Sequence, residues 1–183
     1  MAEQRVSGRY AKSLIDLAVE QNKLDLIYAD MLVFQTTLSA NPALGVLFKS
    51  PIVQGDKKLS VVNKIFAASF NAITLSFFDI VIRKKREYYL PDMATAFIGQ
   101  YNEINKITSA KVTTAVAVSD SVINEVRTFI EKQTGKKVIL ETAINADIIG
   151  GLVIQMEDKL YDASISGKLK KAKQDLLNTY ISK

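Results

Sequence analysis

The sequence predicts two modules, a bundle of about six helices over residues 1–107 and a small α+β domain over residues 108–183. Up to Ile107, apolar residues recur three and four positions apart, the spacing that gathers them on one face of a helix. After Ile107, short segments rich in β-branched residues alternate with helical patterns. The length of 183 residues fits one large domain or two small ones. The change of pattern therefore decides the domain organisation.

Two helices are predicted at the start of the chain. The first covers residues 7–20 and the second residues 24–39, each with one apolar stripe. The second helix ends at Asn41 and Pro42, because a proline cannot continue a helix. We expect the two helices to pack antiparallel across the short turn between them.

Further helices complete the first module. Short helices are expected over residues 42–48 and 56–69, separated by turn-forming Pro and Gly residues. Thr74 is a candidate N-cap for a helix that runs to Arg86. Pro91 suits the first turn of a last helix that continues to Ile104.

The second module is predicted to be a small sheet with two helices. Strands are expected over residues 111–118, 137–144 and 151–156, and a tight turn at Glu157–Lys159 leads into a short strand over 160–163. A helix over residues 121–134 ends at Gly135, a typical C-cap residue. The last helix, residues 167–181, is flanked by lysines that should face solvent. The junction between the modules falls near residues 105–109.

The composition excludes most enzyme chemistries. The chain has no cysteine and no histidine, so it lacks disulfides, thiolate zinc sites, cysteine nucleophiles and histidine bases. The glycine motifs of nucleotide-binding loops are absent, and Gly150-Gly151 precedes a strand, where a bend is the better interpretation. Carboxylates are scattered without a shared pocket. We expect no catalytic residues, no metal and no cofactor.

The chain is expected to be cytoplasmic. It has no apolar run of the roughly 18 to 20 residues that span a bilayer, and its start resembles neither a signal peptide nor a transit segment. The formal net charge of +5 and the pI near 9.3 suit nucleic acid, an anionic membrane or an acidic protein. Net charge alone does not choose among these partners.

A basic cluster offers a nucleic-acid hypothesis. Arg83 to Arg86 precede Tyr88 and Tyr89, so cations could neutralise phosphates while tyrosines stack on bases. The simpler interpretation is that cations in the last turn offset the helix dipole. A basic nucleic-acid-binding adaptor, which would also use the lysines of the last helix, is the main alternative function. Asp79 lies in an apolar run and marks either the solvent side of its helix or a contact with a basic partner.

Two helices have more apolar surface than one core-facing stripe needs. Apolar residues wrap most of the helix predicted over residues 74–86. The stripe on the first helix is flanked by Ala11, Ile15 and Ala18, small or apolar side chains that could line a shallow groove for an incoming helix. Core packing and a partner groove both remain open from the pattern alone.

Several segments resemble one family, the delta subunit of F-type ATP synthases, whose mitochondrial counterpart is the oligomycin-sensitivity-conferring protein. The most specific is the segment from Val138 to Glu157, with its paired glycines and alternating strand. The other matching segments are Arg9-Tyr10-Ala11-Lys12, Asn41-Pro42 to Ser50-Pro51, Tyr89-Leu90-Pro91, Gly135-Lys136-Lys137-Val138, Asp162-Ala163-Ser164-Ile165 and Gly167-Lys168-Leu169.

The resemblance implies a non-catalytic stator subunit at the cytoplasmic face of a bacterial inner membrane, attached only through the complex. The helical module would bind the N-terminal helices of α subunits, and the α+β module would bind the C-terminus of the b subunit. In the family the α-subunit helix lies between the first and fifth helices. The positions carried over for it are Tyr10, Ala11, Leu14, Ile15, Phe78, Ile80 and Ile82. For the b subunit they are the surroundings of Val153, Leu169 and Leu176.

Overall fold

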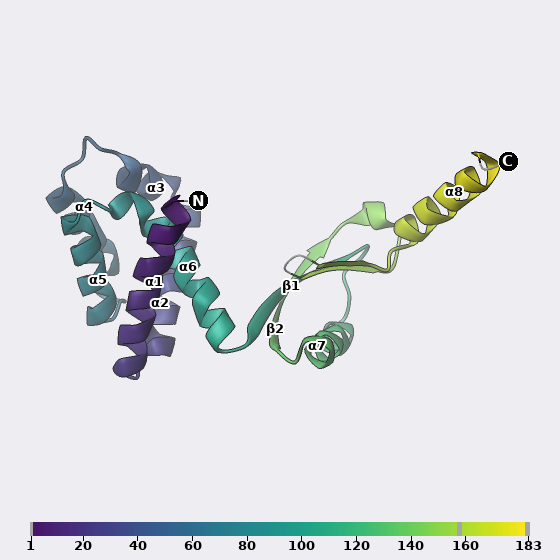
Figure 1. Cartoon of the computed structure of the whole chain (residues 1–183), viewed down its shortest axis with the longest axis horizontal. Helices are drawn as coiled ribbons and strands as arrows, with labels where there is room; N and C mark the ends of the chain where they lie inside the picture. Colours follow the sequence, from purple (N-terminus) through teal and green to yellow (C-terminus); the bar gives the residue numbers. More distant parts are fainter. Residues whose placement is uncertain (1, 157–158, 182–183) are drawn as a thin grey trace. The chain divides into compact units, whose positions relative to one another are not determined.

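The structure, a computed structural model, describes residues 2–156 and 159–181 (Figure 1). The chain divides into two compact units, Met1–Ile104 and Asn105–Lys183. This division lies three residues before the predicted boundary after residue 107, and the first strand begins at Ile107.

The first unit is helical (Figure 1). Each helix predicted here corresponds to one in the structure, with ends shifted by a few residues. The helices are α1 (Ala2–Glu20), α2 (Leu24–Ala40), α3 (Pro42–Lys49), α4 (Gly55–Phe66), α5 (Ala72–Arg83) and α6 (Leu90–Ile104), with a short 3-10 helix over Glu87–Tyr89.

The prediction that Thr74 caps α5 is wrong. Asn71 is the N-cap, and its side chain accepts a hydrogen bond of 3.1 Å from the backbone N–H of Ile73. Thr74 is buried one turn further on, where its hydroxyl donates a 2.6 Å hydrogen bond to the Asp30 carboxylate. The same carboxylate accepts a 2.8 Å hydrogen bond from the Asn71 backbone N–H. Through these two hydrogen bonds, Asp30 of α2 fixes the position of the N-terminus of α5.

Aromatic rings form the centre of the helical unit. Phe34 lies in edge-to-face contact with Phe48, Phe66 and Phe78, at centroid distances of 5.9, 5.6 and 4.9 Å. Such pairs add about 0.5–1.5 kcal/mol each to the gain from burial. Because these rings come from α2, α3, α4 and α5, the cluster fixes four helices to one another.

A buried lysine ties the α3–α4 loop to the 3-10 helix. Lys58 is 2% exposed, and its ammonium donates to the carbonyls of Phe48 and Ser50 at 3.2 and 2.7 Å. Its third hydrogen bond, 2.8 Å, goes to the Glu87 carboxylate. Burial of this charge is tolerated because every N–H of the ammonium has an acceptor.

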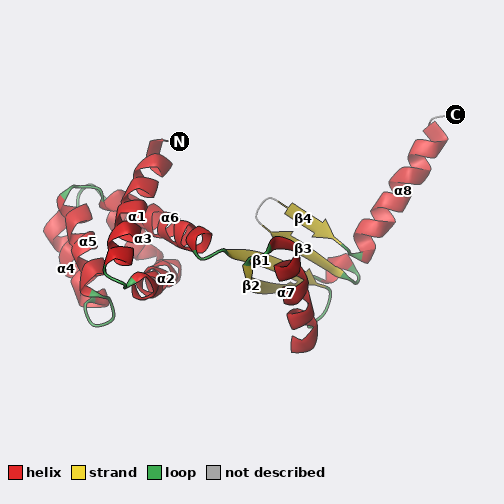
Figure 2. Cartoon of the chain, turned by 60° about the horizontal axis from the view of Figure 1, so that its bottom comes forward, coloured by secondary structure: helices red, strands yellow, loops and turns green. Residues whose placement is uncertain are grey.

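The second unit holds a four-stranded sheet in the order β2-β1-β3-β4 (Figure 2). Strand β1 pairs parallel with β2 and antiparallel with β3, which pairs antiparallel with β4. The elements are β1 (Ile107–Thr114), α7 (Asp120–Thr134), β2 (Lys137–Ile144), β3 (Leu152–Met156), β4 (Lys159–Asp162) and α8 (Ile165–Ile181), with a 3-10 helix over Ala146–Ile148.

The first strand was predicted four residues too late. β1 ends at Thr114, whose hydroxyl donates to the carbonyl of Val116 at 2.8 Å, so residues 115–118 form the connection to α7. Their β-branched side chains mimic strand composition without being paired. Strands β3 and β4 flank the predicted tight turn, of which Glu157 and Asp158 lie outside the described residues.

Two glycines behave as predicted. Gly135 ends α7 in the left-handed conformation, with φ 65°. Gly151 has φ 78°, and a Cβ there would collide with the carbonyl oxygen of Ala163. The pair Gly150-Gly151 therefore serves a bend and a close backbone approach.

In the described part of the chain no single helix is long and apolar enough to cross a membrane, although α2 and α3, bent by 100°, pass that test of length and composition together. The same residues contain no group of three or more acidic side chains that could hold a metal ion.

Candidate helix-docking groove

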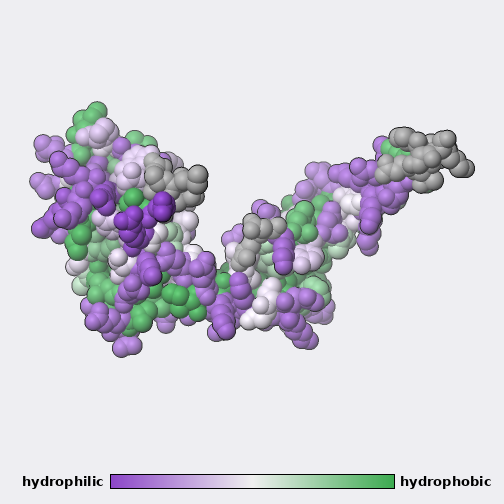
Figure 3. All heavy atoms as spheres, viewed as in Figure 1, coloured by the Kyte–Doolittle hydropathy of each residue, from purple (hydrophilic) through white to green (hydrophobic). Residues whose placement is uncertain are grey.

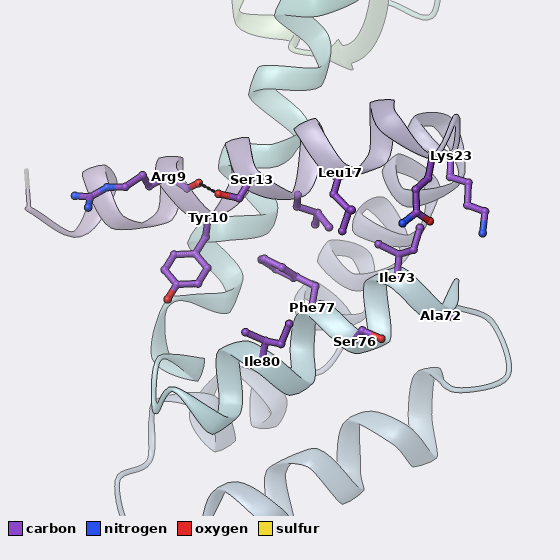
Figure 4. A pocket seen from close by; sticks show the side chains of 12 residues that line it. Arg9, Tyr10, Ser13, Leu17, Lys23, Ala72, Ile73, Ser76, Phe77 and Ile80 are labelled. Atoms are coloured by element: carbon purple, nitrogen blue, oxygen red, sulfur yellow. Dashed lines mark hydrogen bonds between the residues drawn. The ribbon is translucent and has the colours of Figure 1, made fainter.

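A groove of about 610 Å³ runs between α1 and α5 (Figure 4). Its two walls run antiparallel, since Tyr10 lies near Ile80 and Leu17 lies near Ile73. Hydrophobic residues show on this part of the surface in Figure 3. The lining residues are Arg9, Tyr10, Ser13, Leu14, Leu17, Gln21, Lys23, Ala72, Ile73, Ser76, Phe77 and Ile80.

Each wall of the groove is one stripe of a helix. Residues 10, 13, 14 and 17 on α1, and 73, 76, 77 and 80 on α5, follow the three-and-four spacing that places side chains on one face. The middle of the groove is apolar with two serines. Ile80 is 53% exposed and Leu17 is 39% exposed, so both helices present apolar surface that the fold itself does not bury. Such a surface suits the apolar face of another helix.

Tyr10 closes one end of the groove. Its ring lies edge-on to Phe77 with the centroids 6.3 Å apart. The Arg86 guanidinium lies over the same ring at 5.5 Å and donates a 3.0 Å hydrogen bond to the Tyr10 hydroxyl. Arg86 follows α5, and its backbone N–H donates to the Val81 carbonyl at 3.0 Å. The ring is therefore held from two sides by groups anchored on α5.

Three of the seven positions predicted for an α-subunit helix line the groove, namely Tyr10, Leu14 and Ile80, although Leu14 is only 2% exposed and also belongs to the core. The other four do not line the groove. Ala11, Ile15, Phe78 and Ile82 are between 1% and 3% exposed and belong to the core of the helical unit. The physical reason is helical geometry, because a shift of one residue turns a side chain by about 100°.

Three large apolar residues of the groove were not among the positions predicted for it. They are Leu17, Ile73 and Phe77, which line the groove and are absent from the predicted set. The spacing contained the necessary signal, because positions three and seven before Ile80 on α5 are Phe77 and Ile73. The sequence does not show which side of α5 faces α1.

The basic cluster after α5 is partly engaged within the unit. Arg83 pairs with Asp79 one turn earlier at 2.9 Å, which also identifies what Asp79 contacts. Arg86 is bound to the Tyr10 hydroxyl. The ammonium of Lys49 lies 5.9 Å from the centre of the Tyr88 ring. Cations and tyrosines of this segment thus contribute to the structure of the helical unit.

The positions predicted for the b subunit lie on the second unit. Val153 is half-buried in β3, on the sheet face opposite to α7, and Leu160 of β4 shares that face. Leu169 and Leu176 lie on α8 and are 59% and 64% exposed. They are two turns apart, so they lie on one stripe of a helix whose other exposed residues are mostly polar (Figure 3).

Comparison with known proteins identifies the family. Residues 6–176 match the family model described as ATP synthase delta (OSCP) subunit. The ATP synthase subunit delta of Flavobacterium psychrophilum is 33% identical over 97% of this chain and 100% of its own length. That of Cytophaga hutchinsonii is 34% identical over the full length of both.

A solved structure has the same fold. It is a chain of the Toxoplasma gondii mitochondrial ATP synthase hexamer, with a TM-score of 0.73 and 19% identity, and the match covers 93% of this chain and 97% of that one. The family model and the full-length relatives together show that this chain belongs to the ATP synthase delta (OSCP) subunit family.

Proposed function

We propose that this chain is a non-catalytic stator subunit of an F-type ATP synthase. It joins the N-terminal helices of α subunits in the catalytic head to the C-terminus of the b subunit in the peripheral stalk. Family membership supports a place among the subunits of this complex. The observation that carries the head-binding role is the apolar groove between α1 and α5, which has the shape and chemistry of a helix-binding site.

In this proposal each compact unit binds a different partner. The helical unit, α1 to α6, offers the groove and binds the head. The second unit offers an uncovered sheet face with Val153 and Leu160, and the exposed stripe of Leu169 and Leu176 on α8. These surfaces bind the b subunit. A connector needs two separate binding surfaces, and the chain has one on each unit.

The proposed function requires contacts that withstand mechanical load, and it involves no catalysed reaction. The rotor applies torque to the catalytic head during synthesis, and a connector must resist that torque without dissociating from the head or the stalk. Burial of apolar side chains in a groove gives slow dissociation, and aromatic anchors such as Tyr10 and Phe77 contribute more than their share. The subunit works at the cytoplasmic face of the bacterial plasma membrane, which it reaches through the complex.

Calorimetric titration of the full chain tests the proposal. The titrants are two synthetic peptides from the same ATP synthase, the N-terminus of the α subunit (the α peptide) and the C-terminus of the b subunit (the b peptide). Tyr10→Ala with Ile80→Asp should weaken binding of the α peptide at least tenfold and leave binding of the b peptide unchanged. Ile52→Asp is the matched control, because Ile52 is 89% exposed and lies outside the groove. Unchanged affinity for the α peptide in the double variant would overturn the assignment of the groove.

A further inference from the structure

Two tyrosines of the helical unit are stacked face to face. The rings of Tyr28 on α2 and Tyr101 on α6 have their centroids 3.8 Å apart and their planes inclined by only 11°. The Tyr101 hydroxyl donates a 2.7 Å hydrogen bond to the carboxylate of Asp25, three residues before Tyr28. Tyr101 is 8% exposed, whereas Tyr28 is partly exposed and Asp25 is exposed. The two phenol rings and the carboxylate therefore form one group that reaches the surface.

The composition makes tyrosine the main site of one-electron oxidation in this chain. Cysteine, tryptophan and tyrosine are the side chains that lose a single electron most readily, and the chain has seven tyrosines but no cysteine and no tryptophan. Methionine is usually oxidised by accepting an oxygen atom. Three of the four methionines, Met31, Met93 and Met156, are buried. An oxidising equivalent that reaches the chain therefore collects on a tyrosine.

The charges beside the rings favour oxidation of Tyr101 over two other tyrosines. The Arg86 guanidinium lies 5.5 Å from the centre of the Tyr10 ring and donates a hydrogen bond to its hydroxyl. The Lys49 ammonium lies 5.9 Å from the centre of the Tyr88 ring. A nearby cation opposes the loss of an electron, because the ring would become positive next to a positive charge. The group beside Tyr101 is a carboxylate, which stabilises positive charge and accepts a proton.

Loss of an electron and loss of a proton are coupled at Tyr101. Its hydrogen bond to Asp25, together with burial, raises the pKa of the Tyr101 phenol to about 12, so the phenol is neutral at pH 7. When an oxidant removes one electron from the ring, the phenol becomes a strong acid and its proton moves along the hydrogen bond to the Asp25 carboxylate. Because Asp25 is exposed, it passes the proton to solvent. The product is a neutral tyrosyl radical.

The stack gives this radical a partner. Tyr28 loses a second electron to the oxidant and a proton to solvent, which leaves two phenoxyl radicals in face-to-face contact. Their unpaired electrons lie partly on the ring carbons next to the C–O carbon, and they pair in a new C–C bond between the rings. The hydrogen on each bonded carbon then moves to the phenol oxygen as a proton and restores the aromatic ring. In total the chain loses two electrons to the oxidant and two protons to solvent.

We infer that Tyr28 and Tyr101 are the preferred site at which one-electron oxidants modify this chain, and that the modification is a dityrosine link between α2 and α6. Asp25 accepts the proton of Tyr101 in that reaction. The link joins two helices that already pack together. Neither tyrosine lines the groove between α1 and α5, so the oxidised chain keeps its candidate docking surface.

Photo-oxidation of the full chain tests this inference. Illumination of tris(bipyridine)ruthenium(II) with persulfate generates a one-electron oxidant, and a denaturing gel separates single chains from chains linked to one another. The single-chain fraction of the wild type should show dityrosine fluorescence. After proteolysis, mass spectrometry should find two peptides joined through residues 28 and 101. A single-chain fraction without dityrosine, or with links that join other tyrosines, would overturn the inference.

Three substitutions separate the roles of the residues. Tyr28→Phe removes one partner but leaves the hydrogen bond of Tyr101 in place, so dityrosine should disappear from the single-chain fraction while the circular dichroism spectrum is unchanged. Asp25→Asn keeps a hydrogen-bond acceptor but takes up no proton, and it should lower the yield of the link at least threefold. Tyr89→Phe is the matched control, because Tyr89 meets Tyr88 edge-on, with planes at 82° and centroids 5.2 Å apart.

Tyr89→Phe should leave the yield of the link unchanged. Dityrosine that persists in the single-chain fraction of Tyr28→Phe would refute the pairing of residues 28 and 101. A yield in Asp25→Asn equal to that of the wild type would contradict the role of the carboxylate as proton acceptor.

Discussion

Phe77 and Phe78 are consecutive residues of α5 with ring centroids 6.2 Å apart, yet they face different partners. Phe78 is 1% exposed and packs against Phe34 in the core. Phe77 lines the groove and meets the ring of Tyr10. One turn of α5 therefore serves both the stability of the helical unit and its candidate binding surface.

This division predicts separable effects of two neighbouring substitutions. Phe78→Ala should lower the free energy of unfolding by about 3–5 kcal/mol, because it leaves a cavity in a packed aromatic cluster. Phe77→Ala should cost only about 1 kcal/mol of stability but weaken binding of the α peptide strongly. Urea unfolding and calorimetry on both variants provide the measurements. Equal stability losses would contradict the placement of Phe77 in the groove.

The buried ion pair predicts a large effect far from the groove. Lys58→Met removes the ammonium that serves the carbonyls of Phe48 and Ser50 and the carboxylate of Glu87. A carboxylate left buried without its partner typically costs about 3–5 kcal/mol. Lys57→Met, one residue earlier and exposed, should change stability by no more than about 0.5 kcal/mol. A loss below about 1 kcal/mol for Lys58→Met in urea unfolding would show that the pair is replaceable.

Two glycines allow a matched test in the second unit. Gly151→Ala forces an unfavourable φ and a collision with the Ala163 carbonyl. Gly135→Ala imposes a similar φ, but a Cβ there meets nothing within 4 Å. We expect Gly135→Ala to cost about 1–2 kcal/mol and Gly151→Ala clearly more. Thermal unfolding followed by circular dichroism would rank them, and the reverse order would refute the close approach at Gly151.

The positions of the helices and strands were largely predictable from the sequence. Which side of α5 packs in the core and which side lines the groove was not. Periodic spacing located α1 to α6 but not the short 3-10 helix over Glu87–Tyr89, because an apolar stripe on one face of a longer helix leaves a strong pattern. α5 is apolar on most of its circumference, so its pattern does not distinguish Phe77 from Phe78. That distinction depends on where α1 and α2 lie, which is a tertiary property.

The predictions of the α5 N-cap and of the end of the first strand failed because contacts with distant parts of the chain decide both. Asn71 and Thr74 are both acceptable N-cap residues, and the choice follows from the Asp30 carboxylate of α2, far away in sequence. After Thr114, valines alternate with alanines over residues 115–118, which resembles a strand in composition, but the strand pairings of β1 end at Thr114. The role of Arg86 at the groove was out of reach, because it depends on a contact with Tyr10, 76 residues away.

Tyr101 predicts a loss of stability at high pH. Its hydroxyl donates a 2.7 Å hydrogen bond to the Asp25 carboxylate, and this bond, with burial and the nearby negative charge, raises its pKa to about 12 from 10.0. A raised folded-state pKa gives stability that is complete below a pH of about 10 and is lost as the pH rises from about 10 to about 12. Absorbance titration should show a late component from Tyr101 that is absent in Tyr101→Phe. In Asp25→Asn its pKa should fall back toward the ordinary value, and a late tyrosine that persists there would contradict this cause.

The most direct test of the central claim is chemical-shift mapping on the full, isotope-labelled chain. Addition of the α peptide should shift resonances along one face of α1 and α5, around Tyr10, Leu17, Phe77 and Ile80, and leave residues 105–177 unchanged. Addition of the b peptide should do the opposite and shift resonances near Val153, Leu169 and Leu176. Both peptides shifting the same unit, or the α peptide shifting residues away from the groove, would contradict a connector with one binding surface on each unit.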